Sequence, residues 1–397
     1  MDDELLPMIG RRRPLFEGDL AEAEQELTDR IRSSSFLVLG GAGSIGHAVV
    51  KELFRRGPRR LHVVDISENN LVELVRDLRS SLGYIEGDFR TLALDGTSPE
   101  LRYFVQNAPP YSHVLNLAAM KHVRSERDPY TLMRMVCTNV LMTAATMDLA
   151  IERRAQRYFA VSTDKAVNPT NAMGATKRVM ELLLAARSDR IGVSSARFAN
   201  VAFSDGSLLH GFGLRLAKRQ PLSAPEDVLR YFITAHEGAI LCLMACLLSE
   251  NRECFFPAPG DDFEATSFRR IAEKYLEGRG YHAHPCASEE EARDRVEELA
   301  AQGEWPCYFF RSDTTGEKIL EEFRSPDEAV SLERFREIGV VQWQRPQDSA
   351  PLEVFLKRIE SLRGTGGWGR SDILRAWEDI VPEFHHRETG KFLDDRM

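Results

Sequence analysis

The feature that most constrains the fold of this chain is a cluster of glycines between an apolar run and a helix-like stretch. The apolar run covers Phe36 to Leu39, the helix-like stretch covers Ile45 to Arg56, and the segment between them matches G-x-G-x-x-G. Glycine allows a tight turn and a close backbone approach to a bound group, and the first turn of a helix presents N–H groups to an anion. The pattern therefore predicts a strand, turn and helix that bind a dinucleotide pyrophosphate. The expected contacts are Gly40, Gly43, Ser44, Ile45 and Gly46.

An acidic residue follows the glycine cluster at the spacing typical of a dinucleotide fold. Asp65 ends a second apolar run about 20 residues on, where its carboxylate can accept hydrogen bonds from a ribose 2′-hydroxyl and repel a 2′-phosphate. The sequence therefore predicts NAD rather than NADP as the cofactor, with a helix N-cap as the alternative role for Asp65. Asp95 ends the next apolar run and is expected to meet the adenine, with a turn-forming role before Gly96 as its alternative.

Short apolar runs and helix-like stretches continue to alternate along the chain as far as Phe198. Short apolar strands separated by helices are typical of a parallel sheet that is covered on both faces. The sequence therefore predicts an α/β fold with a doubly wound parallel sheet, the Rossmann arrangement that binds NAD. The expected strands cover residues 36–39, 61–64, 91–94, 114–117 and 158–161, and the expected helices cover 45–56, 71–82, 99–106, 130–151 and 173–186.

Beyond Phe198 the alternation gives way to helical stretches interrupted by prolines, which predicts a second, smaller lobe. Helices are expected over 237–249, 267–279 and 289–302, with more helix after Pro326. We predict four parts: an N-terminal arm over 1–33, the NAD-binding domain over 34–200, a substrate-binding lobe over 201–326 and a helical C-terminal extension over 327–397.

Composition and charge exclude several classes of protein. The chain has 397 residues, of which 61 are acidic and 52 basic, giving a formal charge of −9, and 43% are hydrophobic. This composition excludes disorder throughout, and the basic residues are too dispersed for nucleic-acid binding. The six cysteines form no C-x-x-C pair, and the longest apolar stretch, Ala239 to Leu248, is too short to span a bilayer. We therefore expect a cytoplasmic protein with reduced thiols, no nucleic-acid or membrane partner and no metal site.

Two polar segments follow the fourth and fifth expected strands. Asn116 to Val123 comes after the fourth strand, and Ser162 to Lys177 comes after the fifth. The carboxyl ends of parallel strands meet at one edge of the sheet, where α/β proteins bind their ligands. These polar groups are therefore expected to converge on the reacting end of the cofactor and on its substrate.

The same segments carry a resemblance to a known family. The chain resembles the extended short-chain dehydrogenase/reductase superfamily and, within it, the bacterial nucleotide-sugar 4,6-dehydratases of polysaccharide biosynthesis that act on UDP-N-acetylglucosamine. The resemblance covers about residues 35–325 and implies a hydro-lyase that converts a UDP-sugar to a 4-keto-6-deoxy sugar nucleotide with bound NAD, in a homo-oligomer. It rests on five segments in order: Ala118–Val123, Ser162–Lys177, Arg197–Val201, Arg230–Phe232 and Gly316–Lys318.

One position departs from the superfamily pattern. Where most members have Tyr-x-x-x-Lys, with a tyrosine whose hydroxyl removes a proton, this chain has Met173-x-x-x-Lys177. Methionine cannot exchange a proton, so other groups must do the acid–base work, and Thr163, Asp164 and Lys165 supply a hydroxyl, a carboxylate and an amine nearby. Dehydratases of the family with methionine here are known, so the resemblance implies an active enzyme, with an inactive site as the alternative.

The resemblance implies a role for each polar residue of these segments. Lys165, as a neutral amine, would take the C5 proton of the oxidised sugar, and Asp164 would protonate the departing C6 hydroxyl before hydride returns to C6. Thr163 and Lys177 would handle the C4 hydroxyl proton, and Lys177 would also hold the nicotinamide ribose. A local ion pair is the alternative role for Asp164 and Lys165. Further contacts are expected from Ala118 to the cofactor and from Lys121, His122, Asn200 and Arg230 to the substrate, the last two to its diphosphate. For Lys121 and His122 the alternative is a loop anchored by Asn116 with a solvated lysine.

Two other functions fit parts of the pattern. A nucleotide-sugar 4-epimerase uses the same scaffold and first oxidation, but it favours an intact tyrosine and has no need of the Asp164-Lys165 pair. A non-catalytic NAD-binding regulatory or assembly protein would explain the missing tyrosine and the long segment after Pro326. The sequence favours the dehydratase, and analysis of the product separates the three functions.

Overall fold

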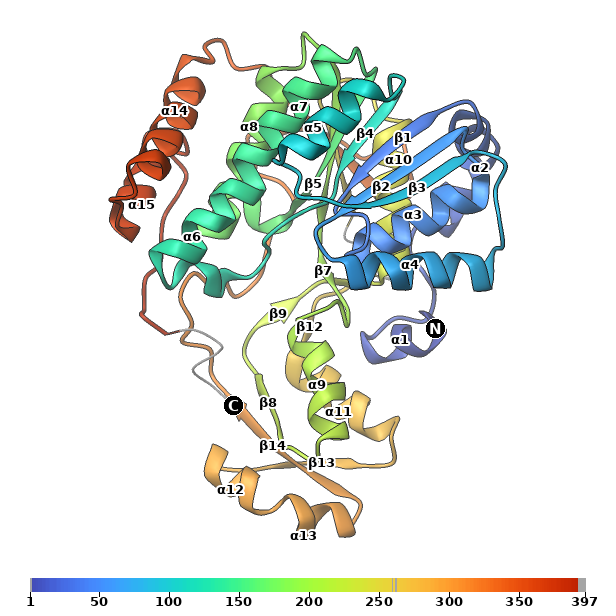
Figure 1. Ribbon diagram of the computed structural model, residues 1–397. Helices are drawn as coiled ribbons and strands as arrows, with labels where there is room; N and C mark the ends of the chain where they lie inside the picture. Colours follow the sequence, from blue (N-terminus) through green and yellow to red (C-terminus); the bar gives the residue numbers. More distant parts are fainter. Residues whose placement is uncertain (1, 259, 261–262, 392–397) are drawn as a thin grey trace.

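The fold is organised around one long sheet. The computed structural model describes residues 2–258, 260 and 263–391. Within them the sheet comprises, in chain order, β1 (Ser35–Leu39), β2 (Arg60–Asp65), β3 (Asp88–Ala93), β4 (His113–Asn116), β5 (Arg157–Thr163), β6 (Gly192–Phe198), β11 (Glu253–Pro257), β15 (Ala329–Ser331) and β16 (Ile338–Gln342). Their order across the sheet is β15-β16-β11-β6-β5-β4-β1-β2-β3 (Figure 1). The strands from β11 to β3 run parallel, whereas β16 and β15 extend the edge antiparallel.

Helices cover both faces of this sheet. One face carries α2 (Glu17–Arg32), α3 (Ser44–Arg56), α4 (Glu68–Ser81) and α10 (Ala235–Leu247). The other carries α5 (Pro99–Asn107), α6 (Pro129–Val136), α7 (Met142–Glu152) and α8 (Ala172–Ala186). With both faces covered, the central strands are nearly all buried, which explains why they read as continuous apolar runs. The predicted doubly wound parallel sheet is confirmed, and the ligand crevice is expected where the chain order reverses between β1 and β4.

The helix predicted over 130–151 contains an irregular turn. It is divided into α6 and α7 by a π-helical turn, η2 (Cys137–Leu141). Such a turn accommodates an extra residue within a helix and is frequent at functional sites. Here it includes Asn139, whose contacts are described below.

The long sheet continues beyond the predicted domain boundary at residue 200. After α10 the chain returns to the sheet as β11, whose five residues are all buried, and the segment after Pro326 adds β16 and β15. The prediction of helix directly after Pro326 is therefore wrong for 329–342, where Val340 and Val341 pack into the core. The four-part division stays a prediction. Strand β11 comes from the predicted substrate-binding lobe, and β15 and β16 come from the predicted C-terminal extension, yet all three belong to the sheet of the NAD-binding domain.

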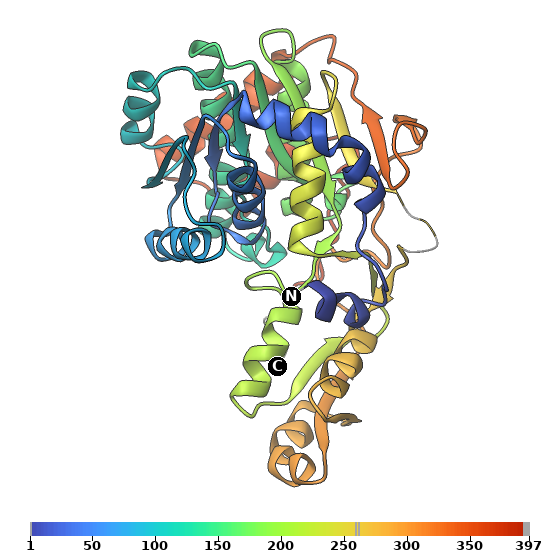
Figure 2. The same cartoon turned by 90° about the vertical axis from the view of Figure 1, so that its right-hand side faces the viewer.

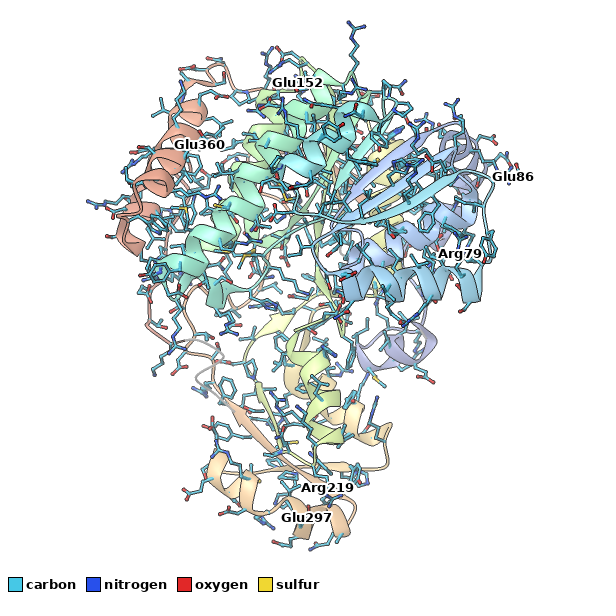
Figure 3. The ribbon with its side chains drawn as sticks, in the orientation of Figure 1. Arg79, Glu86, Glu152, Arg219, Glu297 and Glu360 are labelled. Atoms are coloured by element: carbon cyan, nitrogen blue, oxygen red, sulfur yellow. The ribbon has the colours of Figure 1, made fainter. Side chains whose placement is uncertain are left out.

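The smaller lobe lies below the sheet in the view of Figure 1. It contains α9 (Leu208–Ala217), α11 (Phe268–Glu277), α12 (Glu289–Asp294), α13 (Val296–Ala301), β8 (Leu222–Pro225), β13 (His282–Pro285) and β14 (Glu304–Phe310). Short pairs, β7 (Asn200–Val201) with β10 (Phe232–Ile233) and β9 (Leu229–Arg230) with β12 (Thr266–Ser267), lie at its junction with the sheet. The N-terminal helix α1 (Asp2–Met8) packs on this lobe through Leu6 (Figure 2). Arg219 and Glu297 form an exposed ion pair at its far end (Figure 3).

The C-terminal helices α14 (Ala350–Thr365) and α15 (Arg370–Glu378) pack beside α6 and α8. Phe355, Ile359 and Trp377 are buried in one apolar cluster with Met133 of α6 and Leu183 of α8. No helix of the described ranges combines the length and apolarity that crossing a membrane requires.

Candidate functional site

The glycine turn lies at the carboxyl end of β1, next to β4. Gly40 has a φ of +73°, and a Cβ there would lie 2.5 Å from the backbone nitrogen of Ala118. A Cβ on Gly46 would lie 2.1 Å from the Gly40 carbonyl oxygen. Gly43 differs, because the nearest atom to a Cβ there is 3.8 Å away and its φ of −76° suits any residue. Gly40 and Gly46 are therefore required by the protein's own packing, whereas the space at Gly43 is open to a ligand at the first turn of α3.

Asp65 lies beside this turn at the end of β2. Its Oδ2 accepts a hydrogen bond from the Ala42 amide at 3.0 Å, and its Oδ1 accepts one from the Ser67 amide at 2.9 Å. Ser67, not Asp65, is the N-cap of α4. The alternative of a helix N-cap for Asp65 is therefore wrong, and the position next to the turn is the one a ribose contact requires.

Asp95 has the contacts of a turn-forming residue. Its Oδ1 accepts hydrogen bonds from the Thr97 amide at 2.8 Å and the Thr97 hydroxyl at 2.6 Å. These bonds hold the pKa of Asp95 below its usual value, with a smaller contribution from the Arg134 charge, although burial acts in the opposite direction. The turn-forming alternative accounts for its position, and a contact with adenine stays a prediction.

Thr163, Asp164 and Lys165 form a connected group where β5 ends in the short helix η3 (Asp164–Ala166). The Thr163 hydroxyl donates to Asp164 Oδ1 at 2.8 Å, and Lys165 Nζ donates to the same oxygen at 3.0 Å. Asp164 is 1% exposed, so its carboxyl is shielded from water. The structure therefore brings together the hydroxyl, carboxyl and amine of these three consecutive residues.

Helix α8 carries Lys177, which contacts β5 close to this group. Lys177 Nζ donates to the Val161 carbonyl oxygen of β5 at 2.9 Å. Burial lowers the pKa of Lys177 to about 8, against a smaller opposing effect of Glu181. Met173, one turn earlier, is 4% exposed and packs in the apolar cluster with α15. The side chain that replaces the usual tyrosine is therefore part of the core.

The π-helical turn holds the loop after β4 against α8. Asn139 accepts a hydrogen bond from the Met120 amide at 2.9 Å and donates to the Met120 carbonyl at 3.0 Å and to the Thr176 hydroxyl at 2.9 Å. Sequence reasoning missed Asn139, because regular helical periodicity gives no signal for a one-turn insertion.

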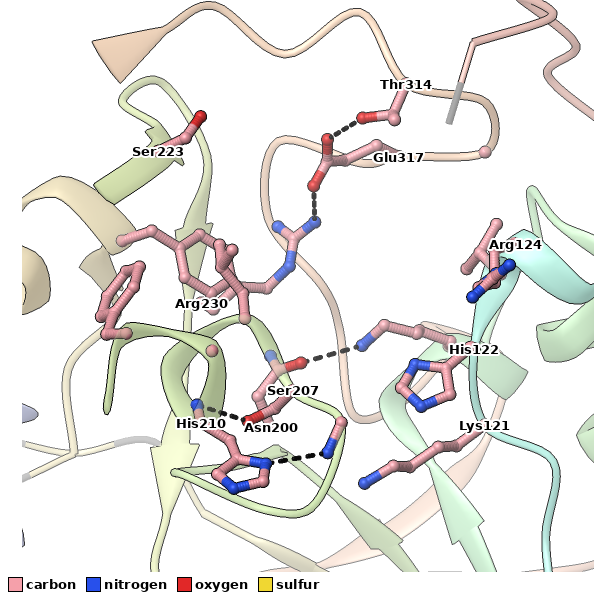
Figure 4. A pocket seen from close by; sticks show the side chains of 18 of the residues that line it. Lys121, His122, Arg124, Asn200, Ser207, His210, Ser223, Arg230, Thr314 and Glu317 are labelled. Atoms are coloured by element: carbon pink, nitrogen blue, oxygen red, sulfur yellow. Dashed lines mark hydrogen bonds and ion pairs between the residues drawn. The ribbon is translucent and has the colours of Figure 1, made fainter. Parts of the chain in front are cut away.

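A cavity of about 620 Å³ opens between the sheet and the smaller lobe (Figure 4). Five predicted site residues line it: Lys121, His122, Lys165, Asn200 and Arg230. Lys121 Nζ donates to the Ser204 hydroxyl at 3.1 Å, and burial lowers its pKa although Asp205 opposes this. Lys121 lines the cavity with much of its side chain exposed, and an amine in this position is suited to an anionic ligand. Because Lys121 is exposed, a solvated lysine stays the alternative to a substrate contact.

Arg230 is already held by neighbouring groups. Its guanidinium donates to the carbonyl oxygens of Leu229 and Lys318 at 2.8 and 2.9 Å and to Glu317 Oε1 at 3.1 Å (Figure 4). These contacts fix the plane of the guanidinium at the cavity wall. A diphosphate contact from Arg230 stays a prediction and would require exchange of at least one of these partners.

The glycine turn and the cavity share a boundary. The Ser44 hydroxyl donates to Asp205 Oδ2 at 3.0 Å and accepts a hydrogen bond from the Asp205 amide at 3.0 Å. Asp205 lies in the loop whose neighbours Gly206 and Ser207 line the cavity. A cofactor on the turn and a substrate in the cavity would therefore be adjacent.

The C-terminal segment reaches the same site. The amides of His385 and Arg387 donate to the carbonyls of Pro169 and Thr170, just before α8, at 3.0 and 3.1 Å. The Gly316 amide donates to the Arg387 carbonyl at 2.8 Å, and the Gly316 carbonyl accepts from Thr170 and Asn171. The C-terminal extension, to which the sequence assigned no role, thus holds two loops of the site in place.

Comparison with known proteins identifies the family. A family described as polysaccharide biosynthesis protein matches residues 36–342, which is more than half of the chain. The chain belongs to this family. The prediction of an extended short-chain dehydrogenase/reductase related to the nucleotide-sugar 4,6-dehydratases is confirmed. The relatives that this chain matches include proteins named as a UDP-glucose 4-epimerase and as a UDP-N-acetylglucosamine 4,6-dehydratase.

Several relatives are similar across much of the chain. A protein of Methanocaldococcus jannaschii named as an uncharacterized membrane protein is 29% identical over 80% of this chain and 88% of its own. The capsular polysaccharide biosynthesis protein CapD of Staphylococcus aureus is 29% identical over 60% of this chain, and the UDP-N-acetylglucosamine 4,6-dehydratase (inverting) of Campylobacter jejuni is 28% identical over 56%. The chain matches only 39% and 66% of the lengths of these last two proteins.

Solved structures show the same fold. Pen from Bacillus thuringiensis covers 84% of this chain and 98% of its own, with a TM-score of 0.64 and 22% identity. The dTDP-glucose 4,6-dehydratase DesIV from Streptomyces venezuelae, solved with NAD bound, has a TM-score of 0.57 at 17% identity over 84% of this chain and 98% of its own. At sequence identities this low, the similarity to these two structures shows only that the fold is shared.

Proposed function

We propose that this chain is an NAD-dependent UDP-N-acetylglucosamine 4,6-dehydratase. The observation that carries the proposal is the hydrogen-bonded group Thr163, Asp164 and Lys165, of which Lys165 lines the cavity. A 4-epimerase needs no such acid and base, and Met173 leaves no tyrosine for the epimerase chemistry. The named dehydratase among the relatives supports this choice, although UDP-glucose 4-epimerases are also similar.

The residues around the glycine turn fit NAD. The open space at Gly43 and the first turn of α3 would receive the pyrophosphate, and Asp65 would accept hydrogen bonds from the adenosine ribose. Lys177 would hold the nicotinamide ribose, and Ala118 would border the cofactor from the end of β4. NAD, when bound, would supply the acceptor and later the donor of a hydride between C4 and C6 of the sugar.

The chain's own residues would move the protons. The C4 hydroxyl proton would pass through the Thr163 hydroxyl to Asp164, along the 2.8 Å hydrogen bond between them, and Lys177 would assist from its position against β5. Lys165 would take the C5 proton, which the C4 ketone acidifies, and Asp164 would give its acquired proton to the departing C6 hydroxyl. Lys165 would then return its proton to C5. The protons balance, because the one released at O4 leaves with the water.

The cavity would hold the UDP group. Lys121 and Arg230 supply positive charge, Asn200 and His122 supply further polar groups, and all four line the cavity. The homo-oligomer stays a prediction.

The direct test is incubation of the purified protein with UDP-N-acetylglucosamine and NAD, followed by NMR of the product. A 4-keto-6-deoxy sugar nucleotide is expected. A 4-epimer would establish the epimerase instead, and recovery of unchanged substrate by NAD-loaded protein would favour a regulatory or assembly role.

Replacement of Gly43 by alanine is expected to weaken NAD binding about tenfold or more without loss of stability, because the methyl group would occupy the space left for the pyrophosphate. The free energy of unfolding should rise by about 0.4–1 kcal/mol, because alanine restricts the unfolded chain and fits this φ. Calorimetric titration with NAD and thermal denaturation measure both effects. Gly364→Ala, at another open position in α14, is the matched control and should leave NAD affinity unchanged. Unchanged affinity in Gly43→Ala would contradict the proposed cofactor site.

A further inference from the structure

A second buried carboxyl faces Lys165, and the mechanism above gives it no role. Glu321 is 4% exposed, and its Oε1 lies 3.9 Å from Lys165 Nζ. The same amine lies 3.0 Å from Asp164 Oδ1 and 3.5 Å from Asn200 Oδ1. Lys165, Asn200 and Glu321 all line the cavity. The amine is thus surrounded by oxygen atoms from three separate parts of the chain.

The two carboxyls near Lys165 share an unusual feature. Each has one buried oxygen, Asp164 Oδ2 or Glu321 Oε2, that accepts no hydrogen bond from the residues the structure describes. Lys318 Nζ approaches Glu321 Oε2 to 3.7 Å but donates its hydrogen bond to the Val167 carbonyl at 2.7 Å. Two buried carboxylates that each leave one oxygen without a donor and that face one lysine are costly to ionise together. One of the two is therefore expected to carry a proton.

Glu321 is the better of the two to hold this proton. Asp164 Oδ1 accepts hydrogen bonds from both Thr163 and Lys165, which stabilise its charged form. Burial raises the pKa of Glu321 above its usual value, Asp164 adds to the rise, and the charges of Lys165, Arg230 and Lys318 oppose it without cancelling it.

We propose that Glu321 takes the proton of Lys165 and so keeps the amine neutral for removal of the C5 proton, an inference that rests on the proposed dehydratase function. The transfer breaks one N–H bond of the ammonium and forms one O–H bond on Glu321, so the number of protons and the total charge of the site are unchanged. Asp164 remains charged and free to accept the C4 hydroxyl proton. The 3.9 Å separation between Lys165 Nζ and Glu321 Oε1 must shorten for this transfer, and catalytic contacts commonly shorten when substrate binds. Glu321 acts through Lys165 and is therefore a positioning residue.

The pH dependence of kcat tests this proposal. In the wild type the proton moves within the site, so kcat for UDP-N-acetylglucosamine should be flat around neutral pH. In Glu321→Gln the amine must lose its proton to solvent, so kcat should be lower at neutral pH and rise about tenfold per pH unit, with KM little changed. Glu321→Asp should keep the flat profile at reduced kcat. Glu322→Gln, an exposed neighbour, is the matched control and should behave as wild type.

Infrared spectroscopy gives a readout that does not depend on turnover. The protein with NAD and UDP bound should show a protonated-carboxyl band at neutral pH that Glu321→Gln removes and Glu322→Gln retains. Parallel pH profiles for wild type and Glu321→Gln, or a band that survives in Glu321→Gln, would overturn the proposal. A wild-type protein that shows the band but forms no 4-keto-6-deoxy product would support the proton on Glu321 and refute the dehydratase function.

Discussion

Replacement of Lys165 by alanine is expected to abolish formation of the 4-keto-6-deoxy product while NAD remains bound. Lys165 Nζ is the amine that faces both the cavity and Asp164, so its loss removes the proposed base for C5. A positioned acid or base contributes about 10²–10⁴-fold to a rate, so kcat should fall about a thousandfold. The glycine turn is built from β1 and α3 and does not involve this side chain. Product NMR and the NAD content of the purified protein measure the two effects.

The control for this variant is an exposed lysine. Lys218 follows α9 on the surface of the smaller lobe, and Lys218→Ala should turn over at the wild-type rate. Dehydration by Lys165→Ala at close to the wild-type rate would show that the base lies elsewhere. Loss of bound NAD together with a lower melting temperature would instead assign Lys165 the structural role of a local ion pair with Asp164.

The parts of the site that could be predicted from sequence are those encoded by neighbouring residues. The glycine turn follows from one strand, one turn and one helix, and the structure shows that Gly40 and Gly46 are required by close packing. Thr163, Asp164 and Lys165 are consecutive, so their meeting at the end of β5 required only that the strand be placed correctly. The parallel sheet likewise follows from a local alternation of apolar strands and helices.

The parts that could not be predicted depend on contacts between distant segments. Glu321 meets Lys165 only because the loop after β14 returns to the sheet, and nothing distinguishes it from the other acidic residues around it in the sequence. The hydrogen bonds from His385 and Arg387 to the loop before α8 join segments that are far apart in the chain. Strand β16 joins the sheet antiparallel after a long irregular connection, which removes the helix–strand alternation that identified the other strands.

Replacement of Arg197 by methionine is expected to lower the free energy of unfolding by about 3–5 kcal/mol, because it leaves a buried carboxylate without its main counter-charge. Arg197 is 1% exposed and binds Glu181 of α8 at 2.8 Å and Glu328 at 2.6 Å, and it donates to the Phe323 carbonyl at 3.0 Å. This group ties β6 to α8 and to the segment that follows Glu321, so its loss should also reduce turnover. Urea denaturation measures the change in stability.

The difference in the free energy of unfolding between wild type and Arg197→Met should become smaller as the pH falls. Burial alone would raise the pKa of Glu181, but Arg197 holds it below its usual value. The stabilisation is therefore present at neutral pH and is lost as the pH falls through the lowered pKa of Glu181. In Arg197→Met the buried Glu181 keeps its longer 3.3 Å contact with Arg178 and can lose its poorly balanced charge by protonation, so the difference in stability from wild type should narrow on acidification. A difference that stays constant with pH would contradict this electrostatic explanation.

An exposed ion pair provides the matched control for this network. Arg345 and Asp189 lie 2.8 Å apart with 49% and 44% of their side chains exposed, so Arg345→Met should change the free energy of unfolding by only about 0–1 kcal/mol. The double variant Arg197→Met with Glu181→Leu should recover part of the lost free energy of unfolding, because it removes the buried Glu181 carboxylate together with its partner Arg197. A loss in Arg197→Met no larger than in Arg345→Met would show that the Arg197 network does not stabilise the junction between the sheet and the site.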